Sequence, residues 1–571
     1  MDAMTDLPAT DAVGAWDAPT CLALIDELLH LRAAMLQAPQ RLTPELARVQ
    51  PHWRASAINL AHYLAMRRHD NRRLQERLAW VGVSSLGRAE THALASVDKV
   101  LGLLHLATGQ AWAAHSDDEP VGARRGPALL EQHAQVLFGP PPQQRAVRIM
   151  VTLPDSAAVD SRLIRTLVRG GMDVARINCA HDEPAAWVAM ARRVRQQARR
   201  AGRPVRILMD LAGPKLRTGP IAGGPPVLKV KPQRDAFGVV TAPALLGLYP
   251  RGGHAPLDAP AAVAVDAEWF AQLRVGDSVH LLDARGAKRQ FLVRECAAAG
   301  AVLAGEHTAY LVGETRLKLR RRSGGALSSA VAGLPPAPAG LRLRRGDRLR
   351  VTPRGIGAPG ALAAGRRRAR PAAVPCTLPQ VLGQVRRGER VWFDDGRIGG
   401  VIRRVGRAGA LVEITDCPPD GATLRPDKGI NLPDSTLHLP ALTDRDIEDL
   451  AVVVKHADLV GLSFAQSAQD VHTLQEQLER LGGGHLGIVL KVETRRGFAH
   501  LPDMLLAGMG SPALGVMIAR GDLAIECGFE RLAEVQEELL WACEAAHVPV
   551  VWATQVLEGL AKTGQPSRAE I

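Results

Sequence analysis

Lys491 and Glu493 are the residues whose types and spacing most directly suggest chemistry. They lie two positions apart in GIVLKVET, an apolar run typical of a buried strand, so their side chains point to the same face. Glu493 and Asp522, which follows the next such run, would give Mg²⁺ two carboxylate ligands, with water and phosphate completing the shell. An ion pair within the protein is the alternative explanation of Lys491 and Glu493.

The same pattern of polar residues at the ends of apolar runs recurs along the chain. Phosphoryl transfer needs positive charge around the moving group, and Mg²⁺, Lys491, Arg176 and Arg217 are groups of the right kind. The full set is Arg176, Asn178, His181, Asp210, Lys215, Arg217, Ser463, Lys491, Glu493, Asp522 and Thr554. The segment 520–523, RGDL, predicts a turn into a helix that either binds an anion or uses Asp522 as an N-cap.

The elements that must position these residues are short apolar runs alternating with amphipathic helical segments. Seven such runs occur in two blocks, which predicts an α/β fold of the TIM-type (β/α) barrel class. In such barrels the chemistry lies where the strands end, at their C-terminal edge.

The boundaries follow from changes in composition. We expect a helical N-terminal domain over 1–145, barrel strands 1–3 over 146–218, a β-rich inserted lid domain over 219–427 and barrel strands 4–7 over 428–571, the chain ending before an eighth strand. Within the insert, RVGDSVHLLD, RRGDRLRV and RRGERVWFDDG each place a Gly-acid pair before a strand, which predicts related hairpins. The segment 357–375, nearly all Gly, Ala, Pro and Arg, is expected to be a disordered loop.

Composition narrows the class of protein. The seven scattered cysteines contain no CxxC pair, no apolar run reaches membrane-spanning length, and the acidic N-terminus does not resemble a secretion signal, so a cytoplasmic protein is expected. The formal net charge is +13. Because no aromatic residues are interleaved in the basic runs Arg320–Arg322 and Arg366–Arg368, we expect solvated loops rather than a nucleic-acid surface.

A series of motifs resembles the pyruvate kinase family in order and spacing. They are GGMDVARIN, MDLAGPKLRTG, FDDG, KGINLPDSTLHLPALTDRDIEDL, LKVET, ARGDLAIE and ATQVLE followed by PSRAE. The resemblance runs from about Val147 to Ile571, only in patches through the insert, and leaves the first 145 residues without a counterpart. It implies a glycolytic kinase that converts phosphoenolpyruvate and ADP to pyruvate and ATP with Mg²⁺ or Mn²⁺, and leaves the oligomeric state open, a homo-oligomer included.

The resemblance also implies roles for individual residues. Arg176, Lys491, Gly521, Asp522 and Thr554 would contact phosphoenolpyruvate or pyruvate, with Arg176, Lys491 and Thr554 in the chemistry. Glu493 and Asp522 would hold the divalent metal, and the nucleotide would meet Asn178, His181, Arg217 and Lys428. The insert around Asp395 would form the lid that excludes water.

Departures from the family pattern lie where a monovalent cation would bind, at Asn178, Asp210 and Lys215. Ala180 replaces the usual serine, Leu211 the usual threonine and Lys215 the usual glutamate, so a fixed ammonium could supply the charge of K⁺ and activity should not require K⁺. Lys215 as a surface lysine without this role is the alternative. Gln466 stands where the family often has arginine, which weakens a supporting contact and leaves open whether the catalytic rate or the substrate affinity changes.

Two other functions remain alternatives to the kinase. One is a non-catalytic or regulatory relative that keeps the pocket without turnover. The other is a metal-dependent lyase or aldolase that stabilises a pyruvate enolate without a nucleotide, against which Arg217 and Lys428 argue.

Overall fold

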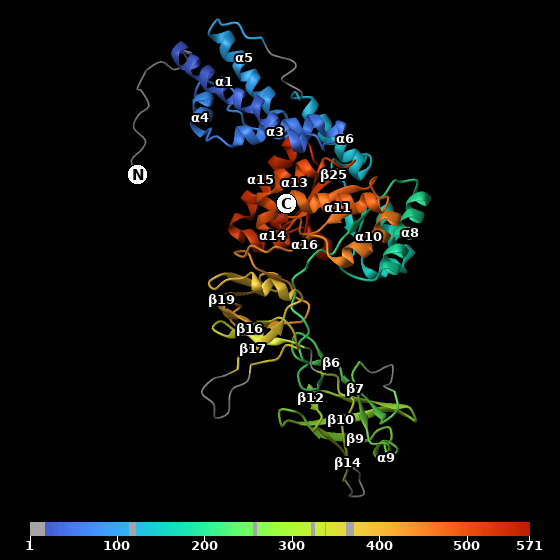
Figure 1. The fold of residues 1–571 in the computed structure, drawn as a ribbon. Helices are drawn as coiled ribbons and strands as arrows, with labels where there is room; N and C mark the ends of the chain where they lie inside the picture. Colours follow the sequence, from blue (N-terminus) through green and yellow to red (C-terminus); the bar gives the residue numbers. More distant parts are fainter. Residues whose placement is uncertain are drawn as a thin grey trace. The chain divides into compact units, whose positions relative to one another are not determined.

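The computed structural model describes residues 17–113, 121–254, 260–320, 326–336, 339–360, 370–554 and 556–570 (Figure 1). The chain folds into two compact units. The second unit is Arg217–Ile430, and the first contains the residues before and after it. The basic run Arg366–Arg368, together with Arg321 and Arg322, lies outside the described residues, as do residues 361–369 of the loop expected over 357–375. The expectation of a disordered loop is wrong for the end of that segment, because Ala372–Pro375 form a strand that pairs with the strand Arg348–Thr352.

A parallel sheet of seven strands organises the first unit, in the order β1-β2-β3-β23-β24-β25-β26. Its apolar strands pack under the helices that follow them, which confirms the predicted TIM-type α/β fold. The strands are β1 (Met150–Thr152), β2 (Val174–Asn178), β3 (Arg206–Asp210), β23 (Leu459–Leu462), β24 (Gly487–Val492), β25 (Leu514–Ala519) and β26 (Val550–Ala553). The main helices around them are α7 (Ser161–Arg169), α8 (Pro184–Ala201), α10 (Asp444–His456), α11 (Ala468–Arg480), α13 (Leu501–Gly508), α14 (Arg520–Cys527) and α15 (Leu532–Ala545).

The second unit is rich in β-structure and contains two large sheets. One sheet has the order β14-β13-β9-β10-β11-β7-β8 and the other β17-β16-β20-β19-β18-β22. The first consists of β7 (Ala244–Pro250), β8 (Ala262–Val265), β9 (Ser278–Leu282), β10 (Lys288–Ala297), β11 (Gly300–Gly305), β13 (Arg316–Arg320) and β14 (Ala326–Ala330). The second consists of β16 (Arg348–Thr352), β17 (Ala372–Pro375), β18 (Arg390–Phe393), β19 (Ile398–Gly406), β20 (Gly409–Asp416) and β22 (Ile430–Asn431).

The three Gly-acid pairs of the insert form the same turn before β9, β16 and β18. In each turn the acid accepts a hydrogen bond from the backbone N–H three residues earlier: Asp277 from Arg274, Asp347 from Arg344 and Glu389 from Arg386, each at 2.8 Å. The glycines Gly276, Gly346 and Gly388 have φ values of 89°, 88° and 98°, a region that favours glycine. The repeated phrase therefore encodes one turn geometry used three times.

Helices near the N-terminus pack on the barrel of the first unit and share its hydrophobic core. They include α1 (Ala18–Arg41), α3 (Arg54–Arg67), α4 (Arg72–Trp80), α5 (Ala93–Ala107) and α6 (Arg125–Phe138). Trp53 donates its indole N–H to the carbonyl of Ser511 at 3.1 Å, and the Asn59 amide donates to the carbonyl of Ala545 at 2.8 Å. Figure 1 shows α3 beside α15 of the barrel.

Two chemical features bear on the expected cellular setting. All seven cysteines are free thiols. Within the part of the chain that the structure describes, no helix is both long enough and apolar enough to cross a membrane.

Candidate active site

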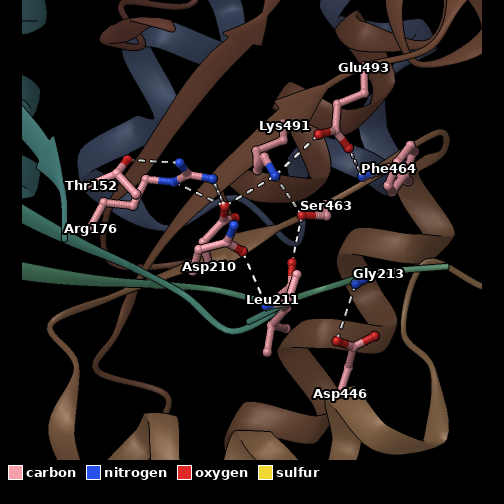
Figure 2. Close-up of polar contacts among 12 residues, drawn as sticks. Thr152, Arg176, Asp210, Leu211, Gly213, Asp446, Ser463, Phe464, Lys491 and Glu493 are labelled. Atoms are coloured by element: carbon pink, nitrogen blue, oxygen red, sulfur yellow. Dashed lines mark hydrogen bonds and ion pairs between the residues drawn. The ribbon is translucent and has the colours of Figure 1, made fainter. Parts of the chain in front are cut away.

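Lys491 is the centre of a buried polar cluster at the C-terminal ends of the barrel strands (Figure 2). Its Nζ lies 3.1 Å from Asp210 Oδ2 and 3.2 Å from Glu493 Oε1, and it donates to Ser463 Oγ at 2.7 Å. Its side chain is 6% exposed. Burial opposes its charged form, but the charges of Asp210 and Glu493 outweigh burial and raise the pKa of Lys491, so the group is an ammonium at neutral pH.

Asp210 joins Lys491 to Arg176 from the neighbouring strand. Arg176 donates to Asp210 Oδ2 through Nε at 3.1 Å and also through Nη2, while its Nη1 donates to Thr152 Oγ1 at 2.9 Å. Although burial would raise the pKa of the fully buried Asp210, Lys491 and Arg176 hold it below its usual value. One ionised carboxylate therefore positions two cations at the strand ends.

The second carboxylate of the cluster, Glu493, is fixed by the loop after β23. Its Oε2 accepts the backbone N–H of Phe464 at 2.7 Å, and Phe464 has a φ of 55°, a conformation uncommon for a bulky residue. Such strained backbone is often found at functional sites. The Glu493 side chain is 3% exposed.

The loop after β3 is held against this cluster by contacts distant in sequence. Ser463 donates to the carbonyl of Leu211 at 2.6 Å, and Asp446 accepts the backbone N–H of Gly213 at 3.2 Å. Gly213 has a φ of 67°, and a Cβ there would lie 3.0 Å from Ser463 Cβ. A side chain larger than hydrogen at position 213 would displace this loop.

Gly521, Asp522 and Thr554 lie at the ends of β25 and β26. A Cβ on Gly521 would lie 3.3 Å from Thr554 Cγ2, so the two residues are neighbours. Arg520 donates through Nε to the carbonyl of Ala553 at 2.8 Å, which ties the start of α14 to the end of β26. Thr554 has a φ of 71°, and Asp522 lies in the first turn of α14.

Glu526, one turn after Asp522 on α14, was not among the residues predicted from the sequence. Burial, with a smaller contribution from Asp522, raises the pKa of Glu526 to about 7 against the opposing hydrogen bond with Asn431. A carboxyl that titrates near neutrality beside a predicted metal ligand is a candidate functional group.

The remaining predicted residues of the first unit follow β2 and β3. Asn178 Oδ1 accepts the backbone N–H of Ala180 at 3.1 Å, and His181 accepts the indole N–H of Trp187 through its carbonyl at 2.8 Å while its side chain is exposed. Lys215 is half-buried, two residues after Gly213.

Arg217 and Lys428 belong to the second unit, where each pairs with an aspartate. Arg217 Nη1 lies 2.8 Å from Asp427 Oδ1, and Lys428 Nζ lies 2.8 Å from Asp394 Oδ1. The segments that carry them are joined by an isolated antiparallel β-bridge between Arg217 and Gly429. The predicted nucleotide residues are thus divided between the two units.

Charge and donor chemistry test whether a divalent metal fits this site. Arg176 and Lys491 balance Asp210 and Glu493, so the cluster is neutral overall and a divalent metal would add net positive charge for a phosphoryl group. In the described residues no three His, Cys, Asp or Glu side chains form a group able to hold a metal ion. Glu493 and Asp522 are carboxylates, the type of ligand of which Mg²⁺ commonly takes one or two before water and substrate complete its shell.

Comparison with known proteins assigns the chain to a family. The family model "pyruvate kinase, barrel domain" matches residues 144–245 and 362–571, more than half of the chain. Of the sheet that contains β7, the strands β8, β9, β10, β11, β13 and β14 lie outside the matched segments.

Individual relatives agree with this match. Pyruvate kinase PKLR of Homo sapiens is 34% identical over 193 residues, 34% of this chain and 32% of its own length. The pyruvate kinase of Geobacillus stearothermophilus is 31% identical over 201 residues, 35% of this chain and 33% of its own. Pyruvate kinase 2 of Candida glabrata is 39% identical over 145 residues, 25% of this chain and 27% of its own.

The chain spans about a third of the length of the first two of these relatives. The parallel barrel sheet, the cluster around Lys491 and the extent of the family match nevertheless point the same way. The chain belongs to the pyruvate kinase family.

Proposed function

We propose that the protein transfers the phosphoryl group of phosphoenolpyruvate to ADP, forming pyruvate and ATP. The observation that carries this proposal is the buried Lys491 ammonium, which Asp210, Glu493 and Ser463 fix at the C-terminal ends of the strands. A preorganised cation at this position stabilises charge that develops during phosphoryl transfer, because it needs little reorganisation.

Each residue has a role in the proposed reaction. Lys491 and Arg176 donate hydrogen bonds to the oxygens of the moving phosphoryl group, while Asp210 positions both. Glu493 and Asp522 would hold Mg²⁺ or Mn²⁺, which when bound supplies positive charge to the phosphoryl and enolate oxygens. Gly521 and Thr554 contact the pyruvate portion, with Thr554 near the carbon that is protonated after transfer.

The nucleotide is proposed to contact Asn178, His181, Arg217 and Lys428. The second unit, through the segment around Asp395, acts as a lid that excludes water from the phosphoryl group. Asp394 and Asp395 both have a φ of 54°, so this loop keeps a conformation that non-glycine residues rarely adopt.

A steady-state assay tests the kinase proposal. The full chain, incubated with phosphoenolpyruvate, ADP and Mg²⁺, should release pyruvate, and Lys491→Ala should lower kcat at least about a hundredfold. Lys99→Ala, which removes an exposed lysine of α5, should leave kcat unchanged. Absence of pyruvate from the folded wild-type protein would contradict the proposal and favour a non-catalytic member of the family.

We also propose that activity does not require K⁺. The candidate cation site is altered and partly occupied, because Asn178 Oδ1 accepts the N–H of Ala180, Ala180 offers no hydroxyl, and Asp210 Oδ2 contacts both Arg176 and Lys491. Among the described residues, Asp210 Oδ1 has no hydrogen-bond partner. Wild-type kcat should be the same in Na⁺ and K⁺ buffers, whereas Lys215→Glu should become at least about tenfold faster when K⁺ is added. Equal K⁺ dependence in the wild type would refute this and leave Lys215 as a surface lysine.

A further inference from the structure

A basic hollow lies outside the candidate active site, between α8 and α10. It has a volume of about 500 Å³, a size typical of small-molecule sites. Figure 1 shows the two helices next to each other on the barrel. The residues that line it are Ala191, Arg192, Arg195, Gln196, Arg199, Arg200, Lys455 and His456.

The positive charges of this hollow are largely uncompensated. Of its five Arg and Lys side chains, Arg195 pairs with Asp458 at 2.8 Å. For the other four, Arg192, Arg199, Arg200 and Lys455, the part of the chain that the structure describes provides no carboxylate within ion-pair distance. No carboxylate is present among the lining residues either.

Helix dipoles account for only part of this charge. The C-terminal end of each helix is equivalent to about half a negative charge, which favours Arg199 and Arg200 in the last turn of α8 and Lys455 in that of α10. Two helix ends and Asp458 together offset about two of the five cations, so an excess of about three positive charges remains.

His456 reports the resulting potential from within the hollow. Its pKa is lowered by burial first, and then by the charges of Arg192 and Lys455. Cations from both helices, Arg192 of α8 and Lys455 of α10, therefore raise the electrostatic potential at the same place in the hollow.

A neighbouring hollow shows where the excess charge ends. It shares Arg195 and Arg199 and continues to Arg203 and Arg206. There Arg203 pairs with Asp173 at 3.2 Å and Arg206 lies 3.9 Å from Asp458. The uncompensated charge is thus confined to the compact hollow between α8 and α10.

The hollow is remote from the strand ends that carry Lys491. Helices of a (β/α) barrel run antiparallel to the strands, so the C-terminal ends of α8 and α10 lie at the opposite edge of the sheet. Asp458, which pairs with Arg195, directly precedes β23. A ligand here would not compete for the predicted catalytic groups.

We infer that the hollow between α8 and α10 binds a compact anion with two or more phosphate groups. Arginine guanidinium groups bind phosphate through paired, charge-assisted hydrogen bonds, and several converging cations favour multiply charged ligands. Nucleic acid fits less well, because the lining residues include no Phe, Tyr or Trp on which bases could stack. This inference does not depend on the proposed kinase activity.

Calorimetric titration of the full chain with inorganic tripolyphosphate, at low salt and without divalent metal, tests the inference. Arg192→Gln/Arg199→Gln should weaken binding at least about tenfold, as should Lys455→Gln on the other helix. Arg162→Gln/Arg169→Gln is the matched control, since it removes two exposed arginines with the same seven-residue spacing from α7 and should change affinity less than about twofold.

The variants should keep the wild-type melting temperature and the wild-type rate of pyruvate formation, because their side chains lie on the surface away from Lys491. Failure of the wild type to bind at millimolar tripolyphosphate, or equal weakening in the α7 control, would overturn the inference. Tighter binding of a 20-base-pair DNA duplex than of tripolyphosphate would also overturn it, in favour of a nucleic-acid surface. Equal binding by all variants would place the anion elsewhere.

Discussion

Among the single residues of the candidate site, Asp210 has the central position, because its buried carboxylate holds Arg176 and Lys491 together. Asp210→Asn keeps the size of the side chain but removes its charge, leaving Glu493 as the remaining carboxylate beside Lys491. The pKa of Lys491 should then fall, since Asp210 is the main group that raises it. We expect kcat for pyruvate formation to fall about a hundredfold and the alkaline limb of the pH–rate profile to move to lower pH.

Asp173→Asn is the matched control for this prediction. Asp173 is also buried and also holds two arginines, Arg145 and Arg203, but it precedes β2 and so lies at the opposite end of that strand. Its loss should reduce the free energy of unfolding without moving the pH–rate profile. An unchanged profile in Asp210→Asn would contradict the positioning role of Asp210.

The sequence predicts the members of this cluster better than their contacts. Arg176, Asp210, Lys491 and Glu493 are recognisable because each ends an apolar run, and the parallel sheet brings such ends to one edge. Nothing in the local pattern indicates that Asp210 rather than Glu493 neutralises Arg176, because that depends on side-chain packing between strands. The raised pKa of Glu526 is likewise invisible in sequence, since burial causes it.

Among the helices, α6 packs against the N-terminal ends of two barrel strands, β24 and β25. Leu137 is fully buried against the first residues of β24 and β25, where a Cβ on Gly487 or Gly515 would lie 2.8 or 2.5 Å from its methyl groups. Leu137→Ala should therefore lower the free energy of unfolding by about 2 to 5 kcal/mol, measured by urea denaturation. Val136→Ala, beside it and 50% exposed, should change stability by less than about 0.5 kcal/mol.

Equal effects of the two substitutions would contradict the packing role of Leu137. The sequence predicts a helical domain over 1–145 but not what this helix packs against, because helical periodicity shows that an apolar face exists and not what covers it. The Gly-acid turns of the insert contrast with this case. In one of them Asp347 accepts the backbone N–H of Arg344, three residues earlier, and Gly346 provides the positive φ, so the local sequence is enough to specify the turn.

Within the first unit as a whole, a buried histidine connects the N-terminal helices to the barrel. In His547, which follows α15, Nδ1 lies 2.9 Å from Ser56 Oγ and Nε2 lies 2.8 Å from the carbonyl oxygen of Thr91. Since a carbonyl only accepts, Nε2 carries the proton in the neutral ring. The carbonyl of His547 in turn contacts His133 Nδ1 at 2.8 Å, and the His133 ring lies against Trp53 in a tilted arrangement.

This arrangement makes the stability of the first unit sensitive to acid. Burial first, opposed by the hydrogen bond to Thr91 and helped by His133, His92 and Arg125, lowers the pKa of His547 to about 4. The unfolded chain binds this proton at about pH 6.5 and the folded chain only near pH 4, so stability is present above pH 6.5 and is lost as the pH falls towards 4. The loss from this residue alone is about 3 kcal/mol across that window, the sum of some 2.5 pH units at 1.36 kcal/mol each.

His547→Gln tests this linkage, because glutamine donates to Thr91 and accepts from Ser56 without titrating. Urea denaturation of the wild type at pH 7 and pH 5 should show a decrease in the free energy of unfolding that is about 2 kcal/mol smaller in the variant. His69→Gln, at an exposed position after α3, should keep the wild-type pH dependence. If His547→Gln loses as much stability between pH 7 and pH 5 as the wild type does, the acid sensitivity resides in other groups and the contact between the helices and the barrel is not coupled to this proton.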